Sequence, residues 1–74
     1  MDILAVVGEN CRRLRRDTGL SQEKAAIDSK IDRTYLSGIE NGKRNPSITV
    51  IADLANTYGV EPYELLMPQK AKRK

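Results

Sequence analysis

The chain has 74 residues, of which 39% are hydrophobic, and its net charge is +3. This length suits one small domain with no room for a separate catalytic domain. No histidine, clustered cysteines, glycine-rich phosphate loop or conspicuous acid pair is present, so we expect no enzyme, no metal site and no cofactor. No apolar run or secretion signal suggests a membrane partner or export, and the lone Cys11 suits a reducing cytoplasm.

The charge is unevenly distributed. Residues 12–44 contain nine Lys or Arg against five Asp or Glu, and residues 70–74 add four basic side chains. A polyanionic partner such as nucleic acid would explain this pattern. An ordinary solvated charged surface is the alternative.

The first predicted helix covers residues 2–18 and ends at Gly19. At 100° per residue, one apolar stripe contains Ile3, Leu4, Val7, Cys11 and Leu14. Cys11 is therefore expected to be a buried packing residue. Arg12, Arg13 and Arg16 point away from the stripe, but Arg15 lies at its edge and needs an acidic partner from elsewhere.

Residues typical of helix ends predict the next two helices. Ser21 is a suitable N-cap for a second helix over residues 22–29, where alanines provide small packing positions. Asp32 can cap a third helix over residues 33–41, and Gly42 can take the left-handed conformation that ends it. The three-residue connection between these helices is typical of a helix-turn-helix.

Two more helices follow. Ser47 can cap a fourth helix, which Gly59 ends and which carries Ile48, Ile51, Leu54, Ala55 and Tyr58. Pro62 suits the first turn of a fifth helix over residues 62–67, and Pro68 follows it. We therefore expect an all-α domain of five helices over residues 1–68 and a disordered basic tail over residues 69–74.

The third helix has two opposite faces. Leu36 and Ile39 lie on the apolar side, which leaves Arg33, Thr34 and Ser37 on the outside. These three side-chain types suit contacts with DNA bases, although an ordinary polar face has the same composition. Glu40 lies at the boundary and is a candidate partner for Arg15; alternatively, Arg15 binds phosphate.

The segments GLSQEKAA, IDRTYLSGIENGKRNPS and IADLANTYGVEPYELL resemble the Xre-type helix-turn-helix domain of lambdoid phage repressors, over residues 7–66. DRTYLSGIE is especially similar to the controller proteins of restriction-modification systems. The resemblance implies a transcriptional regulator that binds a pseudo-palindromic double-stranded DNA operator as a homodimer. Residues 32–41 would be the recognition helix, and RNA polymerase would be a further partner during activation.

The same resemblance assigns roles to individual residues. It implies base contacts by Arg33, Thr34 and Ser37, backbone contacts by Gln22, Asn41, Lys43 and Arg44, and an internal ion pair between Arg15 and Glu40. Two departures from the family stand out. Lys30 replaces a frequent turn glycine, so a left-handed lysine or a reshaped turn is expected. Ala25 replaces a commoner leucine, which leaves a thinner core.

The C-terminal part offers more apolar side chains than one short helix needs. The candidates for a dimer interface are Val50, Tyr63, Leu66 and Met67. The alternative is that such residues only complete the monomer core, which we expect of Leu65. A different function also stays open, namely the antitoxin of a toxin–antitoxin pair, which would bind a toxin and repress its own gene.

Overall fold

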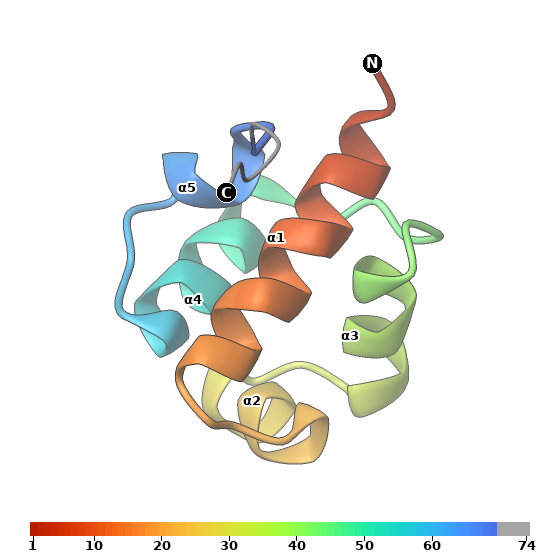
Figure 1. Ribbon diagram of the computed structural model, residues 1–74. Coiled ribbons are helices and arrows are strands. Elements are labelled where there is room, and N and C mark those ends of the chain that lie inside the picture. Colours follow the sequence, from red (N-terminus) through yellow and green to blue (C-terminus); the bar gives the residue numbers. More distant parts are fainter. Residues whose placement is uncertain (70–74) are drawn as a thin grey trace.

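The computed structural model describes residues 1–69, and most of the predicted tail lies outside these residues. The described part is all-helical, as predicted. Its elements are α1 (Ile3–Asp17), α2 (Gln22–Ser29), α3 (Arg33–Glu40), α4 (Ile48–Tyr58) and α5 (Tyr63–Leu66). Figure 1 shows α1 crossing the molecule, with α3 on one side of it and α4 and α5 on the other.

The helices begin largely where their capping residues predict. Asp2, Ser21 and Ser47 each accept a hydrogen bond from the backbone N–H three residues later, at 3.2, 3.0 and 3.2 Å. These bonds satisfy N–H groups that have no partner within the helix. Asp32 occupies the N-cap position of α3, but its side chain makes no capping hydrogen bond. The first turn of α3 is therefore not closed by a side chain.

The turn between α2 and α3 is built around Lys30. Its backbone is left-handed, with φ of 62°. Of the two expected outcomes, a left-handed lysine or a reshaped turn, the structure has the first. The N–H groups of Lys30 and Ile31 donate to carbonyls of α2, at 3.1 and 3.0 Å. These bonds offset the cost of about 1 kcal/mol for a left-handed residue that is not glycine.

The hydrophobic core gathers side chains from all five helices. It consists of Val7, Cys11, Leu14, Ala25, Ala26, Leu36, Ile39, Ile51, Leu54, Ala55, Tyr58 and Leu65. Three predicted stripe residues are not part of it, since Ile3 is 43% and Ile48 is 86% exposed and Leu4 is only half-buried. All three lie in the first turns of their helices, and the prediction of a core role is wrong for the exposed Ile3 and Ile48.

One face of α1 lies unusually close to the end of α3. A Cβ atom added to Gly8 would lie 2.6 Å from the backbone oxygen of Ile39 and 2.7 Å from that of Glu40. Only glycine fits at this distance without moving a neighbour. The close approach sets the position of the C-terminal end of α3. No helix within residues 1–69 has the length and apolar character to cross a membrane.

Candidate nucleic-acid interface

The outer side of α3 carries three polar side chains next to one another. Arg33 and Thr34 are exposed and Ser37 is half-buried, and the three line a polar recess of about 160 Å³. Leu36 and Ile39 on the opposite side are fully buried. The short side chains of Thr34 and Ser37 allow another molecule to approach the helix closely, and Arg33 offers a pair of parallel donors. The structure therefore brings together the three predicted base-contacting residues.

A buried carboxylate holds α3 to the rest of the domain. Glu40 is 4% exposed and accepts hydrogen bonds from Nε and Nη2 of Arg15, at 2.6 and 3.1 Å. The pair predicted from the sequence is thus formed. Nε2 of Gln22 donates to the same carboxylate at 3.1 Å, which joins the start of α2 to the network. Hydrogen bonding to Glu40 raises the pKa of Arg15, so its guanidinium stays charged.

A second arginine, which the sequence argument placed away from the core, also contacts the end of α3. Nη2 of Arg12 donates to the backbone oxygen of Glu40 at 3.3 Å and to Oδ1 of Asn41 at 2.9 Å. Guanidinium has no acceptor, so the Asn41 oxygen must face Arg12, and the amide N–H₂ of Asn41 is left for another partner. Helical spacing could have suggested this role, because Gly8, Arg12 and Arg15 follow one side of α1.

The loop after α3 folds back onto the helix. The backbone N–H groups of Lys43 and Arg44 both donate to the Gly38 oxygen, at 2.8 and 3.2 Å. The guanidinium of Arg44 lies 5.9 Å from the centre of the Tyr35 ring, within the range of a cation–π contact. Lys43 is exposed. The loop is thus fixed at its backbone and presents two cations beside α3.

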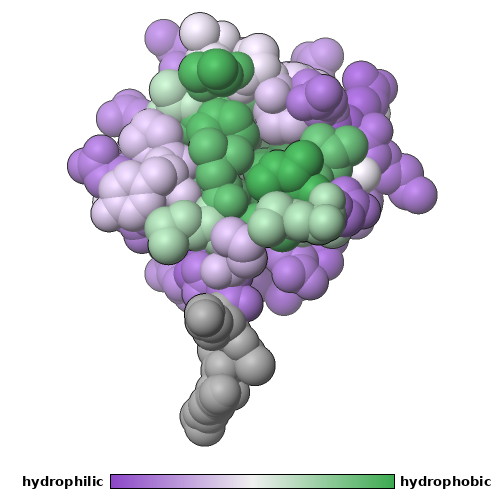
Figure 2. Space-filling view, turned by 90° about the horizontal axis from the view of Figure 1, so that it is seen from above, coloured by the Kyte–Doolittle hydropathy of each residue, from purple (hydrophilic) through white to green (hydrophobic). Residues whose placement is uncertain are grey.

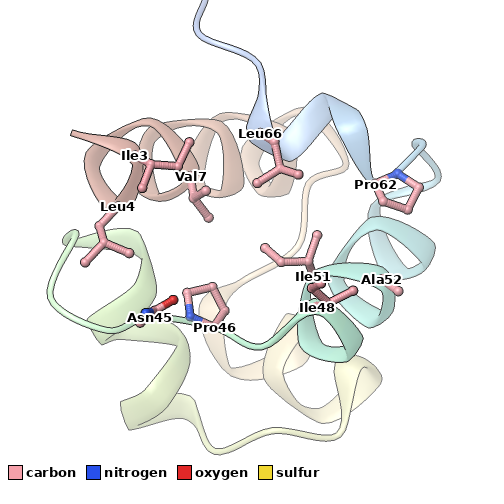
Figure 3. A pocket seen from close by; sticks show the side chains of 10 residues that line it. All are labelled: Ile3, Leu4, Val7, Asn45, Pro46, Ile48, Ile51, Ala52, Pro62 and Leu66. Atoms are coloured by element: carbon pink, nitrogen blue, oxygen red, sulfur yellow. The ribbon is translucent and has the colours of Figure 1, made fainter. Parts of the chain in front are cut away.

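A groove of about 290 Å³ with an almost entirely apolar lining lies between α1, α4 and α5. Ten residues line it, namely Ile3, Leu4, Val7, Asn45, Pro46, Ile48, Ile51, Ala52, Pro62 and Leu66. Figure 2 shows apolar side chains gathered around a hollow on this face, with polar side chains around them. In Figure 3 the side chains from α1, α4 and α5 point toward a common space.

The groove differs in part from the predicted dimer surface. Of the four candidates only Leu66 lines it. Tyr63 and Met67 are 59% and 50% exposed on either side of Leu66 in the chain, whereas Val50 is half-buried and packs against the core. The sequence did not identify Ile48 as a residue of this groove. A helical wheel does not show that the apolar stripe of α4 extends beyond the helices that pack against it.

The tight turn between α2 and α3, together with the buried anchor and polar outer side of α3, defines a helix-turn-helix domain. A family model described as "Helix-turn-helix domain" matches residues 7–66. The chain belongs to this family, and the proteins similar to it include HTH-type transcriptional regulators and control proteins.

The similar proteins include controllers of restriction-modification systems. An uncharacterized HTH-type transcriptional regulator of Sinorhizobium fredii, y4dJ, is 43% identical over 68 residues, which are 92% of this chain and 88% of that protein. The control protein C.MunI of a Mycoplasma species is 42% identical over 65 residues, or 86% and 88% of the two chains. The crystal structure of the restriction-modification controller protein C.AhdI from Aeromonas hydrophila has a TM-score of 0.81 and 45% identity, covering 84% of this chain and 94% of C.AhdI.

Proposed function

We propose that this protein is a restriction-modification controller, a homodimer that binds a pseudo-palindromic operator and represses or activates transcription. The observation that carries the proposal is the recess formed by Arg33, Thr34 and Ser37 on the outer side of an anchored helix. The similarity to C.MunI and C.AhdI over most of both chains supports the controller class.

The three side chains of the recess have distinct chemistry for base recognition. Arg33 can donate two parallel hydrogen bonds to O6 and N7 of a guanine in the major groove. Thr34 can contact a thymine methyl group, and Ser37 can donate to or accept from a base edge. These contacts are weak singly but become selective when the helix is held rigidly, which is the role of the buried Glu40 network.

Four further residues are assigned to the DNA backbone. Gln22 has a second amide N–H beyond the one that it donates to Glu40, so it can bridge the anchor and a phosphate. The free amide group of Asn41 and the cations of Lys43 and Arg44 supply the other donors. Such contacts fix the position of the protein on the duplex without reading its sequence.

The small number of candidate base contacts in one domain supports homodimerisation. Two copies related by a two-fold axis place their recognition helices about 34 Å apart on one side of the duplex. We assign the apolar groove and the side chains around it to this interface, because Ile48, Leu66 and Met67 expose 86%, 44% and 50% of their surface. A two-fold interface uses the same patch twice, so an exposed Ile48 can enter the groove of the other copy.

Footprinting on the DNA upstream of the protein's own gene, at a stated salt concentration, tests the proposal. The expected result is protection of two half-sites centred about 10 base pairs apart. Sedimentation at micromolar concentration should show a dimer. Protection without sequence preference, or a monomer that binds the operator tightly, would contradict the mechanism.

The controller role has its own test. Genes for a methyltransferase and an endonuclease next to this one are expected, with operator positions that allow activation at one site and repression at another. Contact with RNA polymerase is then part of activation, and transcription in vitro with and without the protein measures it. A toxin-like reading frame beside the gene would instead favour an antitoxin.

A further inference from the structure

Asn10 is the largest buried polar side chain outside the Glu40 network, and it faces away from α3. It is 1% exposed, although it lies on α1 among apolar neighbours. Its Nδ2 atom donates to the backbone oxygens of Leu65 and Met67, at 3.0 and 2.8 Å. Its Oδ1 atom accepts from Nη2 of Arg13 at 3.1 Å. Both N–H groups and the oxygen of this side chain are therefore in use.

The two carbonyl groups that Asn10 binds belong to the end of α5. This helix has four residues, too few to be stable alone, and the chain turns extended at Met67. The last carbonyls of such a helix have no partner within it. Asn10 supplies that partner from α1, while Leu65, fully buried, anchors the same turn by packing.

Two exposed apolar side chains, Leu66 and Met67, lie at this turn. Leu66 lines the groove and is 44% exposed, and Met67 is 50% exposed. Their direction depends on how the backbone of residues 65–67 is held, because four-residue α5 has little rigidity of its own. The bonds from Asn10 fix two of the three carbonyl groups in that segment.

We infer that Asn10 is a positioning residue for self-association: it fixes the end of α5 so that Leu66 and Met67 present one fixed surface to a second copy of the chain. This inference rests on the proposed homodimer. It gives a buried residue of α1 a role at the interface although that residue does not itself touch the second copy. Arg13 supports it by holding the amide oxygen, which leaves both N–H groups directed at α5.

Asn10→Asp tests the inference with almost no change of shape. The carboxylate keeps an acceptor for Arg13 but presents oxygen to the two carbonyl oxygens, which leaves them without donors. We expect the dissociation constant of the dimer, measured by sedimentation equilibrium, to rise at least about tenfold. Amide exchange should also lose protection at Glu64 and Leu65, whose N–H groups bond within the α5 turn, while α3 keeps its protection.

Ser29→Ala is the matched control. Ser29 is also a buried polar residue, 2% exposed, and its hydroxyl donates to the Thr57 hydroxyl at 2.8 Å, which links α2 to α4 and involves no residue of α5. It should lower thermal stability yet change the dimer dissociation constant less than about twofold. Arg13→Ala replaces Asn10→Asp if that variant is too unstable to study. Residue 13 is half-exposed, so its truncation leaves no cavity in the core, and the dimer dissociation constant should rise by about two- to fivefold.

The outcomes separate the two proposals. A wild-type chain that stays monomeric overturns the homodimer and this inference with it. A wild-type dimer whose dissociation constant is unchanged by Asn10→Asp, or raised equally by Ser29→Ala, overturns the inference alone. Selective weakening of the dimer by Asn10→Asp and Arg13→Ala supports it.

Discussion

Both Nε and Nη2 of Arg15 donate to the carboxylate of Glu40, so a buried ion pair joins α1 to the last residue of α3. Removing the carboxylate in Glu40→Ala leaves a nearly buried guanidinium without its partner. We expect the free energy of unfolding, measured by urea titration, to fall by about 3–5 kcal/mol.

The exposed ion pair between Lys24 and Asp28, at 3.2 Å on one face of α2, provides the comparison. Asp28→Ala should cost less than about 1 kcal/mol, because water screens and solvates both partners. If the Glu40 and Asp28 variants lost similar stability, the Glu40 network would not be the anchor of α3.

Arg33→Ala and Lys43→Ala separate base recognition from backbone binding. Arg33→Ala should weaken operator binding by about 1–3 kcal/mol and relax the preference at one base pair in each half-site. Lys43→Ala should weaken binding to all sequences alike and lower the salt slope by about one unit. Fluorescence anisotropy on operator and random duplexes over a salt series measures both effects, and identical profiles for the two variants would refute the assigned roles.

Asn41→Asp should alter DNA binding without altering stability. A carboxylate gains a charge attraction to Arg12 but sits at the unfavourable C-terminal end of the α3 dipole, so the free energy of unfolding should stay within about 0.5 kcal/mol. The same carboxylate has no donor for a phosphate and repels it, so affinity should fall at least about tenfold. Undiminished binding by a stable Asn41→Asp variant would remove Asn41 from the interface.

Gly8→Ala and Gly38→Ala test the close approach of α1 to α3. Alanine normally stabilises a helix interior by about 1 kcal/mol relative to glycine. At position 8 the new methyl group meets backbone oxygens of α3, so we expect a net loss of about 1–3 kcal/mol and displaced NMR signals along α3.

At position 38 the new methyl group meets Cγ of Arg44, a side-chain atom that a change of the Arg44 χ1 rotamer can displace without moving the backbone. Gly38→Ala should therefore stay within about 1 kcal/mol of the wild type while shifting Arg44 from the Tyr35 ring. Equal tolerance of both substitutions would mean that Gly8 does not set the position of α3.

Stability should decrease in alkaline solution because of Cys11. Burial raises the pKa of its thiol to about 11, and burial also raises the pKa of Tyr58, whose hydroxyl lies 3.4 Å from the sulfur. Between about pH 9 and 11 the unfolded chain has lost the thiol proton while the folded chain keeps it, so unfolding becomes easier as pH rises. Below pH 9 the full stability is present.

Urea titrations of the wild type from pH 8 to 11 should show a fall of about 2–3 kcal/mol from Cys11, to which Tyr58 adds. Cys11→Ala lacks the thiol, so its free energy of unfolding should fall less over this pH range, through Tyr58 alone. This variant should also be less stable than the wild type at pH 8. Parallel curves for the two proteins would show that Cys11 is not the group that titrates.

The helix boundaries and the two ends of the ion pair could be predicted from the sequence because their causes are local. Ser21 and Ser47 cap helices by bonds within one turn. The left-handed Lys30 is one of the two outcomes expected where the similar family carries glycine. Arg15 could be predicted to need a carboxylate because it lies beside the apolar stripe. The common outward side of Arg33, Thr34 and Ser37 could be predicted from helical spacing, whereas the recess that they line is seen only in the structure.

Contacts that depend on how helices cross could not be predicted in this way. The bonds of Asn10 to the end of α5 require the distance between α1 and α5, which a helical wheel does not contain. The exposure of Ile48 likewise depends on where α1 and α5 end. Asp32 lacks its expected capping bond although its type and position are suitable, so residue type permits such a bond without ensuring it.

The packing of α1 against neighbours on several sides determines how freely its sequence can vary. Of its 15 residues only Ile3, Ala5, Glu9, Arg16 and Asp17 are exposed, and Ile3 lines the apolar groove. A library that randomises this helix should therefore yield functional variants mainly at Ala5, Glu9, Arg16 and Asp17. Although we assign no DNA contact to it, α1 should tolerate fewer substitutions than the solvent-facing side of α4.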